Sequence, residues 1–234
     1  MELDWEFFIK TFFVCLRAVP VALNIVAVTL IISLPVGFLF AFLRIKGNIT
    51  VKRLISMYVS VIRGTPIVVQ ILVLYSMLPS LLAVFFERIN SPLNVYDVNP
   101  IYYAYTVFSL YTIAILSEVF RSALLTVPKD QLDAAESIGL TTVQAYRRII
   151  IPQAMVAALP NICNATVNLI KASSLAFLMT VKEITAVAKI EAAFGYNYIE
   201  AYLVIWVIYI LICIVVEQIF KILENRLKIY KSAA

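Results

Sequence analysis

Four ionisable side chains lie inside otherwise apolar stretches of this sequence: Arg63, Glu118, Arg121 and Lys171. An ionisable group at membrane depth is costly and usually faces protein or water, so each marks a candidate ligand contact. Arg63 and Glu118 have the charges needed to bind a zwitterionic ligand. Equally, Glu118 and Arg121 are three residues apart and can neutralise each other, and Arg63 can hold two helices together. For Arg121 and Lys171 a structural role is favoured, because both lie near a predicted span boundary and can snorkel.

Catalytic chemistry has little support in this sequence. The chain has no histidine, and its three cysteines form no CxxC pair, which argues against metal sites and histidine-dependent nucleophiles. The five glycines form neither GxxxxGK nor GxGxxG, so the chain has no phosphate-binding loop of its own. We therefore expect no catalytic residue, no metal site and no cofactor bound by this chain. The net charge of +5 forms no basic stripe with interleaved aromatic residues, so nucleic acid is not an expected partner.

The composition is that of an integral membrane protein. Hydrophobic residues make up 63% of the 234 positions, charged residues only 14%, and the mean hydropathy is +0.96. Because a helix needs about 20 apolar residues to cross a bilayer, we expect one all-α membrane domain over residues 1–234. The predicted spans are 18–43, 54–86 with an interruption at Arg63, 98–117, 149–170, and 201–216 extending toward 220. Trp5, Phe8, Phe12 and Phe13 recur at helical spacing and predict a short interfacial helix before the first span.

The distribution of Lys and Arg predicts the orientation. Of 19 such residues, eleven fall in the loop after the first span, the loop after the third span and the carboxyl-terminal tail, against five on the other side. Positively charged loops remain in the cytoplasm, so we expect the amino terminus outside and the carboxyl terminus inside.

A polar segment at 128–152 interrupts the apolar pattern. Leu132, Ala135 and Ile138 have near-helical spacing, Gly139 permits a sharp change of direction, and Thr141 or Thr142 can cap a second short helix. Two short helices joined at a glycine make a compact protrusion that another protein could dock against. An amphipathic loop lying on lipid headgroups is the other interpretation of this pattern.

This segment carries a family resemblance. Asp133-Ala134-Ala135, Gly139, Ile149 and Ile151-Pro152 have the spacing of the EAA–G–I–LP pattern in the cytoplasmic loop of bacterial ABC-importer permeases, with Asp for Glu and Ile for Leu. "VIRGTP" (61–66), "SEVFRSALLTVPKDQ" (117–131) and "LPNICNATVNLIKASSLA" (159–176) are similar to segments of the polar amino-acid branch. The chain thus resembles this branch over most of residues 18–220.

The resemblance implies the type I ABC-importer (MetI-like) permease fold, with five core transmembrane helices in the bacterial plasma membrane. It also implies a second permease chain, identical or related, two cytoplasmic ATPase subunits that bind ATP and Mg, and an extracytoplasmic solute-binding protein. The segment 128–152, hereafter the coupling loop, would dock in a groove of the ATPase. Its implied contact residues are Asp133, Ala134, Ala135, Gly139, Arg147, Ile149 and Pro152.

The implied cargo is an amino acid. The expected pathway residues are Arg63, Thr112, Ser117, Glu118, Lys171, Ser173 and Ser174. Ala172 stands where relatives often have Asp, and Tyr111 where a third-span Asn is frequent. The missing acid disfavours a strongly basic substrate, so a neutral polar or cystine-like one is favoured.

Two other classes of protein remain open on the residues alone. A secondary transporter driven by an ion gradient would account for the spans and the buried charges, but no internal repeat is evident. A membrane anchor or sensor subunit that does not transport would use the same loop to recruit a soluble partner.

Overall fold

The computed structural model describes residues 3–89 and 94–232, and every regular element in these two ranges is a helix. The α-helices are α1 (Trp5–Leu16), α2 (Val19–Lys46), α3 (Ile49–Gly64), α4 (Ile67–Arg88), α5 (Pro100–Thr126), α6 (Lys129–Ser137), α7 (Thr142–Ala145), α8 (Ile151–Ser173), α9 (Ile184–Gly195) and α10 (Tyr198–Ser232). Five stretches are long and apolar enough to cross a membrane: Trp5–Lys46, Ile67–Arg88, Pro100–Thr126, Thr142–Met179 and Tyr198–Arg226. The all-α, five-span expectation is confirmed.

Helices α2 and α5 pack closely because small residues of α2 lie at their contact. Ser33, Gly37 and Ala41 recur every four residues on α2 and are all buried. A Cβ atom at Gly37 would lie 2.9 Å from Leu116 Cβ on α5. Small side chains at such a spacing let two helix backbones approach each other within a membrane.

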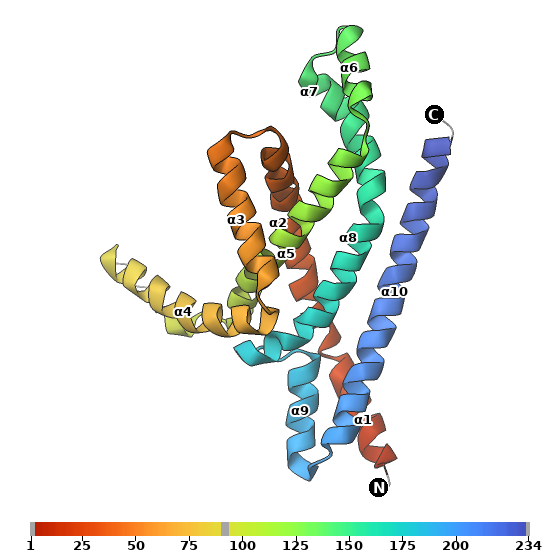
Figure 1. Ribbon diagram of the computed structural model, residues 1–234. Helices are drawn as coiled ribbons and strands as arrows, with labels where there is room; N and C mark the ends of the chain where they lie inside the picture. The colour runs from red at the N-terminus through yellow and green to blue at the C-terminus, as the bar shows by residue number, and fades with distance from the viewer. Residues whose placement is uncertain (1–2, 90–93, 233–234) are drawn as a thin grey trace.

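The stretch predicted as one span over 54–86 consists of two helices. The break falls at Thr65 and Pro66, just after the predicted interruption at Arg63, because proline holds the preceding residue in an extended conformation. Gln70 stabilises the break: its Nε2 donates to the carbonyl oxygens of Ile62 (2.7 Å) and Thr65 (3.0 Å). Figure 1 shows α4 leaving the end of α3 at a wide angle.

Two other predicted spans ended too early. Helix α5 continues past 117 to Thr126, and α10 continues past 220 to Ser232. Helix α9 was not expected at all. The aromatic amino-terminal stretch is helical as predicted, but its placement in the membrane interface stays a prediction.

The chain has two distinct ends (Figure 1). The amino terminus, α1 and α9 lie at one end. The turn between α2 and α3, the coupling loop with α6 and α7, and the carboxyl terminus lie at the other. The three basic segments assigned to one side of the membrane therefore occupy the same end of the molecule.

Candidate functional site: the coupling loop and the charges near it

The coupling loop folds as two short helices that meet at Gly139. The backbone of Gly139 has φ +87°, a conformation that residues with a Cβ atom rarely adopt. Nothing lies within 4 Å of a Cβ atom built there, so the constraint comes from the backbone and not from space. Gly139 N donates to Glu136 O (3.0 Å) and Leu140 N donates to Ala135 O (3.1 Å), which satisfies the last carbonyls of α6.

The second half of the loop is fixed by a capping box. Gln144 N donates to Thr141 Oγ1 (3.3 Å), and Thr141 N donates to Gln144 Oε1 (2.9 Å). The Thr142 hydroxyl donates to Glu136 Oε1 (2.8 Å), which ties α7 to α6. From α7 the chain continues through a π-helical turn, Tyr146–Ile150, directly into α8. The second half of the loop is therefore joined to α8 by continuous helical backbone.

Some of the predicted contact residues are exposed on the coupling loop, and others are buried within it or against the core. Asp133 and Ala134 are exposed, whereas Ala135 is 2% exposed and packs within the loop. Arg147 and Pro152 are exposed, and Ile149 is half-buried against the core around Phe120. The most exposed apolar side chains of the loop are Ile138 and Val143, which are 78% and 75% exposed. The sequence analysis did not name either residue as a contact, although both lie in the polar segment beside predicted turn and cap positions.

Charges meet near the coupling-loop end of α2 and α5. Glu118 Oε2 accepts from Arg44 Nη1 at 2.6 Å, and Glu118 Oε1 accepts from Arg121 Nε at 3.0 Å. The pairing of Glu118 with Arg121 was one of the two predicted alternatives and is confirmed. The first predicted span ended at residue 43 and left Arg44 in the basic loop that follows, but α2 extends to Lys46 and Arg44 reaches Glu118 on α5.

The other predicted pathway charges lie on the surface of the chain. Arg63 is exposed at the end of α3 and takes part in neither of the two ion pairs found among the described residues. Lys171 is exposed on α8 and lines a groove of about 470 Å³ with Trp206 and Glu217 of α10. The structure does not bring Arg63 and Glu118 together in one pair.

Of the four predicted pathway hydroxyls, two are buried without a hydrogen-bond partner among the described residues and two are hydrogen-bonded within the chain. Thr112 and Ser117 are buried, and their hydroxyls have no hydrogen-bond partner among the described residues. The Ser173 hydroxyl donates to Ile170 O (2.7 Å) and the Ser174 hydroxyl to Lys171 O (2.6 Å). Their role in a pathway stays a prediction, and the burial of Thr112 and Ser117 favours helix packing.

A buried carboxylate escaped the sequence analysis. Glu183 is fully buried between two spans and caps α9, accepting from Thr185 N (2.8 Å) and Ala186 N (2.9 Å). The Tyr209 hydroxyl also donates to it at 3.0 Å. Burial raises the pKa of Glu183 above its ordinary value, although these hydrogen bonds oppose the shift. Its position before the apolar run of α9 is the one signal that could have found it.

Sequence comparison gives close relatives over nearly the whole chain. The family described as "binding-protein-dependent transport system inner membrane component" matches residues 33–229. The chain is 32% identical over 225 residues to the probable amino-acid permease protein YxeN of Bacillus subtilis, which covers 96% of both chains. It is 31% identical over 209 residues to the L-cystine transport system permease protein TcyL of the same organism, covering 89% of this chain and 85% of that protein.

Two solved structures share the fold. A chain of an amino acid ABC transporter superposes with a TM-score of 0.81 at 24% identity, covering 97% of this chain and all of that one. A chain of the MetNI methionine ABC transporter in an inward-facing conformation gives 0.67 at 16% identity, covering 91% and 95%. The predicted MetI-like permease fold is confirmed, and the family consists of transport components and not of enzymes. This chain belongs to the family of inner membrane components of binding-protein-dependent transport systems.

Proposed function

We propose that this chain forms half of the translocation pathway of an ATP-driven importer and receives mechanical work from an ATPase through its coupling loop. The observation that carries the proposal is the shape of that loop. It projects beyond the ends of α5 and α8, as Figure 1 shows, and its hinge at Gly139 is fixed by hydrogen bonds on both sides. A loop that only lay on headgroups would need no such fixed bend.

The complete assembly would contain a second permease chain, identical or related, and two cytoplasmic subunits that bind ATP and Mg. An extracytoplasmic binding protein would deliver the cargo, in keeping with the family's description. The amino terminus would lie outside the bacterial plasma membrane and the carboxyl terminus in the cytoplasm, as the excess of Lys and Arg at the coupling-loop end favours.

The loop's continuity with α8 suggests how closure of the ATPase pair would act. Ile138 and Ala134 are exposed on the loop and would form the face that seats in the ATPase, and α7 passes into α8 without a flexible linker. Because the ion pair of Arg44 with Glu118 joins α2 to α5, and Arg121 holds the same carboxylate from within α5, the helices near the loop would rotate as a near-rigid body.

The proposed cargo is an amino acid that is neutral and polar or resembles cystine. The similarity to YxeN supports an amino acid, and the similarity to TcyL supports a cystine-like one. Ala172 also favours this class, because it offers no acid to a cationic side chain. Among the predicted pathway residues, Arg63 and Lys171 are exposed on this chain, as residues facing a second chain or a shared pathway must be. Glu118 would contact cargo while already paired with Arg44 and Arg121.

Reconstitution tests the proposal. The chain, its ATPase and its binding protein are placed in liposomes, and uptake of labelled cystine and glutamine is measured. We expect uptake that requires both ATP and the binding protein. Uptake driven by an ion gradient without ATP would establish a secondary transporter, and the absence of any flux in the complete assembly would favour an anchor or sensor.

A further inference from the structure

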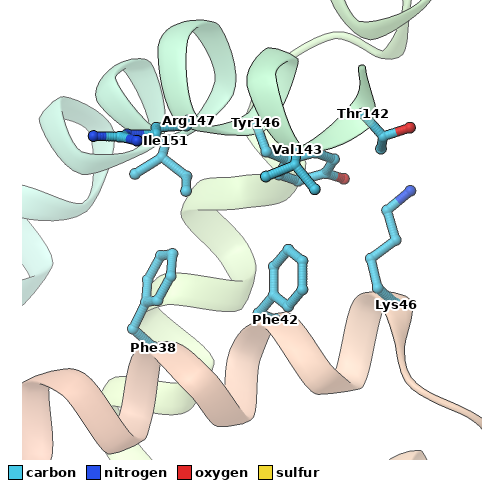
Figure 2. A pocket seen from close by; sticks show the side chains of 8 residues that line it. All are labelled: Phe38, Phe42, Lys46, Thr142, Val143, Tyr146, Arg147 and Ile151. Atoms are coloured by element: carbon cyan, nitrogen blue, oxygen red, sulfur yellow. The ribbon is translucent and has the colours of Figure 1, made fainter.

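A groove of about 530 Å³ separates the end of α2 from the coupling loop (Figure 2). One wall is α2, which contributes Phe38, Phe42 and Lys46. The opposite wall runs from α7 to the start of α8. Its lining residues are Thr142, Val143, Tyr146, Arg147 and Ile151. The accessible surface inside the groove is almost wholly apolar.

The groove extends along α2 over a depth similar to that of the headgroup and the upper acyl chain of one lipid. Phe38, Phe42 and Lys46 are four residues apart and lie along one side of α2, as Figure 2 shows. At a rise of about 1.5 Å per residue, Phe38 lies roughly 12 Å deeper than Lys46 along the helix. Lys46 is the last residue of α2, which places it at the headgroup level if α2 spans the bilayer.

The charges around the groove favour an anion. Lys46 and Arg147 line it, and none of its lining residues in the described part of the chain is acidic. The Lys46 side chain rises from α2 toward Tyr146, with its Nζ 5.3 Å from the ring centroid. That ring packs edge-on against Phe42 at 5.6 Å, so this aromatic pair joins the two walls of the groove beside the ammonium group.

We propose that this groove binds an anionic phospholipid of the leaflet on the coupling-loop side. The phosphate pairs with Lys46 at the mouth, and one acyl chain lies along Phe42, Phe38 and Ile151. A chain seated there fills the space between α2 and the second half of the coupling loop. The lipid would then contact both α2 and the coupling loop, and it would influence how the loop moves relative to α2. The inference rests on the proposed orientation, with the coupling loop in the cytoplasm.

Photolabelling tests this directly. The full chain is reconstituted in nanodiscs of phosphatidylcholine with either phosphatidylglycerol or phosphatidylcholine carrying an acyl-chain diazirine, and labelled peptides are mapped. Phosphatidylglycerol should label 38–46 and 142–151 more strongly than phosphatidylcholine does. Lys46→Gln should lower this labelling about fivefold, because each Lys or Arg near an anionic membrane surface contributes about 1 kcal/mol. The matched variant Lys221→Gln, on α10 and outside the groove, should label as the wild type does.

Equal labelling by the two lipids, or labelling unchanged in Lys46→Gln, would overturn the inference. So would loss of labelling when the ATPase is bound, because the ATPase would then occupy the groove. The experiment needs no transport, so it can succeed even if the proposed importer function fails. Conversely, an importer that couples normally but takes up no label here would remove the lipid site alone.

Discussion

Arg44 and Glu118 join the last turn of α2 to α5 by an ion pair 2.6 Å long. The same carboxylate also accepts from Arg121, one turn further along α5, so a single acid holds two guanidinium groups. All three side chains are half-buried or deeper, and they lie at the end of the helices from which the coupling loop projects. The cluster is positioned to keep the two helices together during the proposed movement of the loop by the ATPase.

Replacing Glu118 should therefore destabilise the chain. Glu118→Gln leaves Arg44 and Arg121 without their anion, and the loss of hydrogen bonds between charged groups costs about 1.5–3 kcal/mol. The measurement is the thermal unfolding midpoint of the purified chain in detergent. Glu87→Gln, at an exposed position near the end of α4, is the matched control. Equal midpoints for the two variants would show that the cluster contributes nothing to stability.

Gly139→Val should uncouple transport while leaving membrane insertion intact. A β-branched residue at φ +87° is strained, whereas asparagine tolerates the left-handed region. We expect substrate-stimulated ATP hydrolysis by the reconstituted assembly to be lost in Gly139→Val and largely retained in Gly139→Asn. Normal stimulation in the valine variant would remove the bend of the loop from the mechanism.

Gly37→Val should separate α2 from α5. Its Cβ atom would lie 2.9 Å from Leu116 Cβ and 3.3 Å from the backbone nitrogen of Ser117, and overpacking of this kind costs about 1–3 kcal/mol. Gly64→Val is the control, because nothing lies within 4 Å of a Cβ atom built there. The yield of monodisperse protein and its unfolding midpoint should fall for the first variant only. A similar fall in both variants would contradict the close approach at Gly37.

Glu183 should make stability depend on pH. Its pKa in the folded chain is raised above the ordinary value of 4.5, so the folded state holds a proton that the unfolded state has lost. The resulting stabilisation is complete below pH 4.5 and is lost as the pH rises through the raised pKa. Unfolding midpoints measured across this range should fall with pH in the wild type and vary less in Glu183→Gln. Parallel curves for the two proteins would exclude this titration.

The spans and the coupling loop could be predicted because local patterns encode them. Apolar runs of about 20 residues identify membrane helices, and Gly139 with Thr141 specifies a bend followed by a helix cap. The predicted interruption at Arg63 lies only a few residues before the observed break at Pro66. The error arose because a charge marks the position of a break less sharply than a proline does.

What the sequence could not give depends on contacts between distant segments. Arg44 follows an apolar run and has the pattern of a loop charge, and only the packing of α2 on α5 pairs it with Glu118. Thr112 and Ser117 were interpreted as pathway residues. The spacing of residues along a helix does not determine whether their face contacts a cavity or another helix. The burial of Glu183 likewise requires Tyr209, from a different span.

The most direct test of the account places a photoactivatable cross-linker on Ile138→Cys, at the exposed tip of the coupling loop. Cys15 and Cys213 are buried, so replacing the half-buried Cys163 with serine limits background labelling. In the assembled transporter the probe should cross-link to the ATPase, and a probe on Lys221→Cys serves as the control at the same end of the chain. Cross-linking of the Ile138 probe to lipid alone, with the ATPase present, would contradict the proposal that this loop receives the work of ATP hydrolysis.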